Sequence, residues 1–148
     1  MNKPKIVVIG SCNTDMVVKA NRLPAPGETV LGGTFLMNPG GKGANQAVAA
    51  ARLGGNVTLI SKIGNDLFGK QSIESYRAEG INTDYVFTDY KNPSGVALIS
   101  VDSSGENCII VASGANSFLN ISDIEKTQGI LSEANIILMQ LEIPIQTV

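Results

Sequence analysis

The chain has 148 residues, of which 43% are apolar, 16% are charged and 16 are glycine, so it is neither a disordered chain nor a coiled coil, and its length allows one α/β domain. Eleven basic and thirteen acidic residues give a net charge of −2, and the basic residues are scattered, so we expect no nucleic-acid partner. Because there is no histidine, Ser-His-Asp and Cys-His catalysis and histidine-ligated zinc are excluded.

The first part of the chain predicts a buried strand followed by an inserted flap. Residues 5–9 form a continuous apolar run, which is typical of a strand buried on both faces in a parallel sheet. A helical pattern begins only near Gly43, after two extended stretches at 16–20 and 29–32. Prolines and a glycine mark a turn between these stretches, so we predict a β-hairpin flap that projects from the sheet.

The elements that follow alternate between helices and strands. Ser122 and Glu125 have the spacing of a capping box, which predicts the start of the last helix. In chain order we expect a helix at 43–53, a strand at 57–63, a helix at 68–79, a strand at 84–88, a hairpin of 95–102 and 106–112, a helix at 122–133 and a strand at 136–141. This order predicts one doubly wound, mostly parallel α/β domain over 1–148, with a small β-lid formed by about 15–33 and 95–112.

The two cysteines and the lengths of the apolar runs indicate in which cellular compartment the protein is expected. Cys12 and Cys108 form no C-x-x-C pair and lie in apolar stretches, so we predict that both are free and buried. No apolar run approaches 18 residues and no signal-peptide pattern is present. We therefore expect a cytoplasmic protein with no membrane partner.

Polar side chains follow three of the predicted strands. Asn13 and Asp15 follow the first strand, Asn65 and Asp66 the second, and Glu142 the last. Ligands of open parallel sheets bind beyond the carboxyl ends of the strands, so these amides and carboxylates are candidates for binding a polyol. For Asn65 and Asp66 we favour the role of turn or capping residues.

Residues 38–45 form a glycine-rich segment that leads into a helix N-terminus. Backbone N–H groups, the helix dipole and the charge of Lys42 could hold hydroxyls or a phosphoryl oxygen there, and Asn45 adds donors and an acceptor. Gly43 follows Lys42 where a Walker A loop requires Ser or Thr, and a G-x-G-x-x-G fingerprint after the first strand is absent. A P-loop and a dinucleotide-binding site are therefore not expected.

The sequence resembles the ribokinase family of carbohydrate kinases over nearly its whole length. The resemblance rests on five motifs in register: G-S-C-N-T-D at 10–15, P-A-P-G-E-T at 24–29, G-G-K-G-A-N-Q-A at 40–47, G-A-N at 114–116 and M-Q-L-E at 139–142. It implies a sugar site that comprises Asn13, Thr14, Asp15, Gly41, Lys42, Gly43, Ala44, Asn45, Val111 and Glu142. Within the site, Lys42 is expected near the transferring phosphoryl group.

The resemblance also implies an activity, cofactors and an assembly. The expected reaction transfers the γ-phosphoryl of ATP to the 5-hydroxyl of D-ribose, with Mg²⁺ and possible use of a monovalent cation, in a homodimer joined through the β-lid. Lys42 and Gly43 favour ribose within the family. Family members are about twice as long, so we expect the nucleotide site and the catalytic Asp outside these residues, no metal site within them, and no activity for the 148 residues alone.

Two alternatives remain open at this point. One is a non-catalytic sugar-binding or dimerisation module. The other is a related kinase that acts on a ketose or a nucleoside, because such an enzyme would use the same loops. Binding of ribose and ATP, measured separately, would distinguish the first alternative from a kinase.

Overall fold

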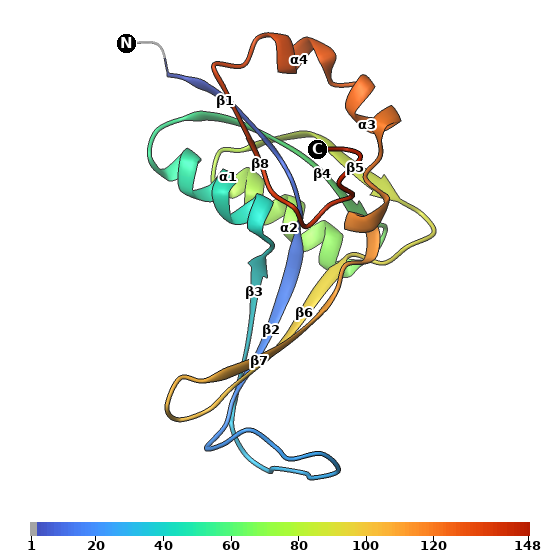
Figure 1. Cartoon of the computed structure of the whole chain (residues 1–148). Coiled ribbons are helices and arrows are strands. Elements are labelled where there is room, and N and C mark those ends of the chain that lie inside the picture. The colour runs from blue at the N-terminus through green and yellow to red at the C-terminus, as the bar shows by residue number, and fades with distance from the viewer. Residues whose placement is uncertain (1–2) are drawn as a thin grey trace.

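A computed structural model describes residues 3–148 as an α/β unit with a long β arm (Figure 1). The α/β unit is built on a four-stranded parallel sheet with the order β5-β4-β1-β8. Its strands are β1 (Lys5–Ile9), β4 (Asn56–Gly64), β5 (Asn82–Asp89) and β8 (Ile136–Met139). The apolar run of β1 therefore lies inside a parallel sheet, as the sequence predicts.

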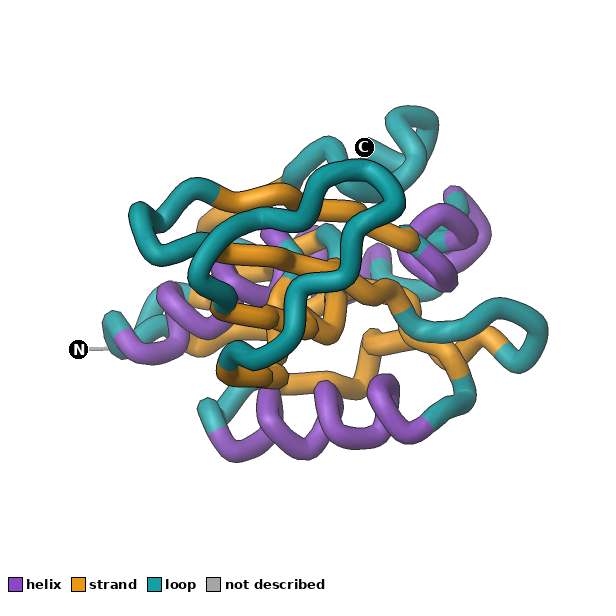
Figure 2. Tube along the Cα trace, turned by 90° about the horizontal axis from the view of Figure 1, so that it is seen from below, coloured by secondary structure: helices purple, strands orange, loops and turns teal. Residues whose placement is uncertain are grey.

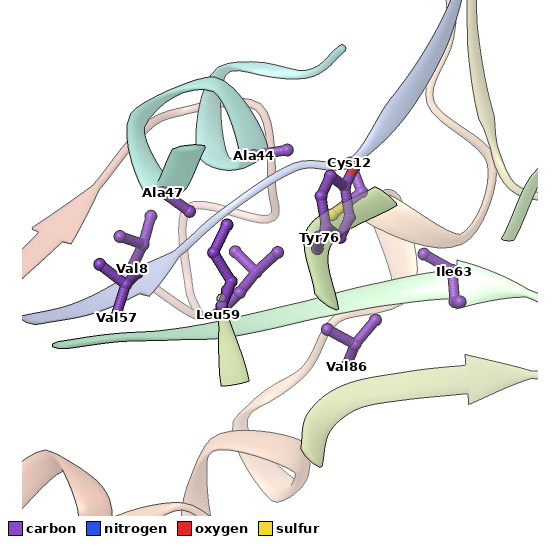
Figure 3. Packing of buried hydrophobic residues seen from close by; sticks show 10 residues of the cluster. Val8, Cys12, Ala44, Ala47, Val57, Leu59, Ile63, Tyr76 and Val86 are labelled. Carbon is purple, nitrogen blue, oxygen red and sulfur yellow. The ribbon is translucent and has the colours of Figure 1, made fainter. Parts of the chain in front are cut away.

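Helices cover both faces of this sheet. On one face, Val8 and Leu59 pack in a cluster with Ala47 of α1 (Lys42–Arg52) and Tyr76 of α2 (Leu67–Ala78) (Figure 3). On the other face, Val7 and Ile9 pack with Leu119, which follows a 3₁₀ turn at Gly114–Phe118. The short helices α3 (Ile121–Glu125) and α4 (Gln128–Ser132) lie on this second face. The doubly wound arrangement is thus confirmed. None of the helices within residues 3–148 is long and apolar enough to cross a membrane.

The arm is a second four-stranded sheet with the order β3-β2-β6-β7. Its strands are β2 (Asn13–Lys19), β3 (Thr34–Gly40), β6 (Gly95–Val101) and β7 (Asn107–Ala112). The predicted hairpin of β6 and β7 is confirmed, and β2 pairs in parallel with β6. The long loop between β2 and β3 forms the end of the arm and faces the viewer in Figure 2.

The boundaries of the predicted flap are wrong for both strands, and β2 comprises 13–19 instead of 16–20. Residues 29–32 form no strand, and β3 comprises 34–40 instead, so that 38–40 of the glycine-rich segment belong to a strand. Gly32 and Gly33 have φ values of 91° and 119°, a conformation that ends extended pairing before Thr34. Pro39 is tolerated because β3 is an edge strand.

The last predicted helix is also different. It is divided into α3 and α4, and the capping box is formed by Asn120 and Asp123 rather than by Ser122 and Glu125. Asp123 is fixed in this role because its Oδ2 accepts a hydrogen bond of 2.6 Å from Lys62 Nζ. Strand β8 is shorter than expected and ends at Met139.

The prediction for the cysteines holds for one of the two. Both are free, and Cys12 is buried while Cys108 is exposed on β7. Cys108 is exposed because all six residues of β7 lie in solvent. Burial raises the pKa of Cys12 to about 11, although hydrogen bonds with Ser61 and Tyr76 act in the opposite direction. Cys12 lies beside Tyr76 in the core (Figure 3), and its thiol stays protonated at neutral pH.

Gly43→Ala is expected to lower the stability of the full-length protein by about 1–3 kcal/mol. A Cβ at this position would lie 2.6 Å from the carbonyl carbon of Gly10 and 2.7 Å from Ser11 N, and these backbone atoms cannot yield as a flexible side chain would. The matched control is Gly129→Ala in α4, where a Cβ would meet nothing within 4 Å. Thermal unfolding should show a lower Tm for the first variant only; equal Tm values would contradict the close approach of α1 to β1.

Candidate functional site

A pocket of about 390 Å³ lies where the α/β unit meets the arm. It is lined by Ser11, Asn13, Val111, Ser113, Asn116, Leu141, Glu142 and Ile143. The chain enters it directly after β1 and again after β8, so that it occupies the carboxyl ends of two neighbouring parallel strands. Three of the predicted residues, Asn13, Val111 and Glu142, are therefore brought together. A larger hollow of about 660 Å³ lies at the far end of the arm, away from these strand ends.

Glu142 is held against the N-terminus of α1. Its Oε2 accepts hydrogen bonds from Ser11 Oγ at 2.7 Å and from the backbone N–H of Lys42 at 3.1 Å, and its Oε1 pairs with Lys42 Nζ. Burial is the largest single influence on the Glu142 pKa and raises it, but the bonds from Lys42 and Ser11 together outweigh burial, so the pKa is lowered. Glu142 is thus a fixed carboxylate at neutral pH.

Glu142→Gln is expected to remove on the order of 2 kcal/mol of stability at neutral pH, because hydrogen bonds to a charged acceptor are lost. The folded pKa of Glu142 lies below its ordinary value of 4.5, so this contribution is complete above that value and disappears as the pH falls through the folded pKa. Urea unfolding of both proteins between pH 7 and pH 3 should show the difference shrink in acid. A difference that stays constant with pH would contradict the charged state of Glu142.

Asn116 is a residue of the pocket that the sequence-based site did not include. It is 1% exposed, and its carboxamide binds both backbone groups of Cys12, with Oδ1 accepting from the N–H at 2.8 Å and Nδ2 donating to the carbonyl at 2.9 Å. Nδ2 also donates to Asn13 Oδ1 at 2.8 Å and to the Ser113 carbonyl at 3.0 Å. Asn116 therefore ties the turn after β1 to the 3₁₀ turn after β7. The G-A-N motif at 114–116 was the available signal.

Asp15 lies close to the pocket without lining it. It follows Asn13 on the same face of β2, at the register of Ala97 on β6 and two strands from Val111 on β7. Burial raises the pKa of its carboxyl, and the negative charge of Glu142 raises it further. The two carboxylates therefore share one electrostatic environment, which favours a ligand that can donate hydrogen bonds to both.

The remaining predicted residues lie around the N-terminus of α1. Gly41, with a φ of 90°, is the residue before α1, and Gly43 is buried in the first turn. Lys42 is exposed and reaches the pocket only through Glu142. Thr14 lines a different hollow, against α2, and Ala44 and Asn45 line a groove between α1 and α2. The structure thus does not bring these last three into the pocket of Glu142.

Asp66 has the structural role that we favoured. It is the residue before α2, and its Oδ1 accepts from the Gly69 N–H at 2.8 Å. Its two oxygens also accept from Ser94 N and Ser94 Oγ, each at 2.7 Å. These bonds lower its pKa even though burial, the largest influence, raises it. Asp66 therefore connects α2 to the start of β6, and both of its carboxylate oxygens take part in structural hydrogen bonds.

The residues at the pocket do not form a metal centre. Within residues 3–148, no three or more acidic, cysteine or histidine side chains lie together in a way that could hold a metal ion. Glu142 is the one carboxylate among the described side chains that line the pocket. The donors and acceptors present are instead suited to a neutral polyhydroxyl ligand.

Comparison with known proteins identifies the family to which the chain is similar. Residues 3–144 match the family described as pfkB family carbohydrate kinase. The chain is 44% identical over 138 residues to a mouse ribokinase, covering 93% of this chain and 43% of the relative. It is 41% identical over 143 residues to a deoxyribokinase of Salmonella typhi, covering 97% and 47%. A structure of Arabidopsis thaliana ribokinase complexed with ribose and ATP superposes with a TM-score of 0.80 at 36% identity, covering 99% of this chain and 49% of that one.

The matches cover nearly all of this chain but only part of each relative. The chain spans about half the length of the relatives, with shares of 43% to 49%. The matched residues 3–144 include both sheets and every helix described above. The chain belongs to the pfkB family of carbohydrate kinases.

Proposed function

We propose that the full-length protein with this sequence transfers the γ-phosphoryl of ATP to the 5-hydroxyl of D-ribose, and that residues 1–148 supply the sugar site. The observation that supports this most directly is the pocket at the carboxyl ends of β1 and β8, where Glu142 is held as a carboxylate and Asn13 lines the same pocket. Relatives with 41% to 44% identity are a ribokinase and a deoxyribokinase, and one neighbour was solved with ribose and ATP.

The pocket has the chemistry that a sugar requires. A hydroxyl group both donates and accepts hydrogen bonds, so its binding site needs acceptors and donors side by side. Glu142 and Asp15 are acceptors, and Asn13 carries an amide that can donate. The apolar side chain of Val111 on β7 lines the same pocket and would contact carbon atoms of the ring. The proposed sugar ligands Gly41 and Gly43 would add close backbone approach at α1.

The identity of the sugar is a finer proposal. Ribose is favoured by Lys42 and Gly43 in the glycine-rich segment. A relative with 41% identity is named deoxyribokinase, so 2-deoxyribose is the competing sugar within this proposal. Lys42 would place a positive charge beside the sugar during transfer, because its ammonium pairs with Glu142 at the pocket. A ketose or a nucleoside remains the alternative substrate class.

The proposal includes ATP and Mg²⁺ as cofactors of the full-length protein. It also includes a cytoplasmic location, because ATP and Mg²⁺ are available in the cytoplasm. A monovalent cation is proposed only from the family resemblance. The described residues do not fit a Mg²⁺ site, since they contain no suitable cluster of acidic side chains. From the family resemblance we propose that residues 1–148 bind the acceptor, and that the metal ligands and the base that deprotonates the 5-hydroxyl lie outside them.

A coupled ATPase assay on the full-length protein tests the proposal. With saturating ATP and Mg²⁺, the value of kcat/KM should be at least about tenfold higher for ribose than for 2-deoxyribose, because a site built around a hydroxyl discriminates against its absence. Fructose and adenosine, which represent the alternative substrate classes, should also be poorer substrates than ribose. Preference for another of these substrates would replace ribose. Calorimetric binding of ribose without turnover would favour the non-catalytic sugar-binding module instead.

A second proposal, on assembly, is favoured by the surface of the arm. Apolar side chains lie exposed on both faces of the second sheet, with Leu36 at 41%, Leu98 at 52% and Ile109 at 53% exposure. Patches of this kind mark protein interaction sites. We propose that the second sheet is a lid that joins two copies of the protein, and the test is given in the Discussion.

A further inference from the structure

The orientation of the Asn116 side chain is fixed by the backbone alone. Its Oδ1 faces the N–H of Cys12, which can only donate, and its Nδ2 faces the carbonyls of Cys12 and Ser113, which can only accept. A rotated carboxamide would place donor against donor and acceptor against acceptor at three contacts. With 1% exposure, the side chain has no solvent to compensate for such a rotation.

This fixed amide determines the orientation of Asn13 in turn. Asn116 Nδ2 lies 2.8 Å from the side chain of Asn13, so the atom of Asn13 that faces it must be an acceptor, Oδ1. The other end of the Asn13 amide is then Nδ2, which carries two N–H groups and can only donate. Because Asn13 lines the pocket, this end supplies a hydrogen-bond donor to a bound ligand.

Gly95 leaves the room that this pair of amides requires. A Cβ at Gly95 would overlap with both Asn13 Oδ1 and Asn116 Nδ2. Strand β6 begins at Gly95, directly opposite Asn13 in the parallel pairing with β2. The contact between the two asparagines is therefore built into the junction of the arm with the α/β unit.

We propose that Asn116 is a positioning residue that makes Asn13 a donor toward the sugar. The inference rests on the proposed function and deepens it. One sugar hydroxyl accepts a hydrogen bond from Asn13 Nδ2 and donates one to a carboxylate, Glu142 or Asp15. The site therefore binds a group that can donate and accept at the same time, as a hydroxyl does. The amide atoms of Asn116 bond to Cys12, Asn13 and Ser113, so Asn116 acts on the sugar through Asn13.

A double-mutant cycle in the full-length protein tests this. Asn116→Ser should raise the KM for ribose about three- to tenfold, the cost of a hydrogen bond between neutral groups, and leave the KM for ATP unchanged. Asn13→Ala should raise the ribose KM at least as much. In the Asn13→Ala background, Asn116→Ser should then have little further effect, because the group through which it acts is absent. The proposal would be overturned if the two substitutions together raised the ribose KM by the product of their separate effects, or if Asn116→Ser alone left the ribose KM unchanged.

A measurement on the unmodified full-length protein is independent of whether the variants fold. With ¹⁵N-labelled asparagine, the Asn116 side-chain protons should exchange slowly with water both with and without ribose. The Asn13 side-chain resonance should shift when ribose is added, and that of Asn116 should change less. Rapid exchange at Asn116 would overturn the fixed orientation. Slow exchange at Asn116 with no response of Asn13 to ribose, in a protein that does not phosphorylate ribose, would instead refute the proposed function.

Discussion

Replacing Asp15 by alanine in the full-length protein is expected to raise the KM for ribose about tenfold or more, because a hydrogen bond to a charged group contributes about 1.5–3 kcal/mol. Asp15 shares the face of β2 with Asn13, and the charge of Glu142 acts on it. A ligand bound between these carboxylates would relieve their repulsion by donating to both. Since Asp15 is proposed to contact only the sugar, the KM for ATP should not change.

The control for this variant is Asp84→Ala. Asp84 is an exposed residue of β5, the edge strand of the parallel sheet, so it carries the same charge without belonging to the pocket. Its removal should leave both KM values unchanged. The isosteric Asp15→Asn should lie between the wild type and Asp15→Ala, because it keeps an acceptor and loses the charge. Unchanged ribose kinetics in Asp15→Ala would remove Asp15 from the sugar site.

The α/β unit was predictable because its signals are local. The apolar run at 5–9 and the helical spacing that stops at Gly54 identify β1 and α1 within one or two residues. Glu142 was found by a rule of the same kind, since it follows the predicted last strand and parallel strands place their carboxyl ends at one edge. The alternation of helices and strands predicts a mostly parallel sheet with helices on both faces, whereas the strand order β5-β4-β1-β8 comes from the structure.

The second sheet was less predictable because its pairings are distant in sequence. Residues 38–40 read as part of a glycine-rich loop, and they are a strand only because they pair with 13–15. The role of Asn116 depends on contacts with Cys12 and Asn13, more than 100 residues earlier. The exposure of Cys108 likewise follows from a sheet whose outer strand has no cover in a single copy. Local spacing contains none of this information.

A charge on the second sheet is expected to separate the proposed dimer into monomers. Rows of apolar side chains cross the four strands on each face; Leu36, Val17, Ile99 and Ile109 form one row, and Met37, Met16, Leu98 and Ile110 form a row on the opposite face. An aspartate buried in an apolar interface costs several kcal/mol, so the Kd of the dimer should rise more than about hundredfold.

Light scattering on three variants of the full-length protein tests this expectation. Ile109→Asp and Leu98→Asp place the charge on opposite faces, and Leu53→Asp is the control, because Leu53 is 89% exposed at the end of α1 and lies outside the arm. The wild type and the control should have the mass of a dimer, and at least one of the arm variants should have that of a monomer. The face that responds identifies the buried side of the lid, because a charge on a face that stays in solvent costs little. A monomeric wild type, or two arm variants that remain dimeric, would show that the exposed apolar rows have another partner.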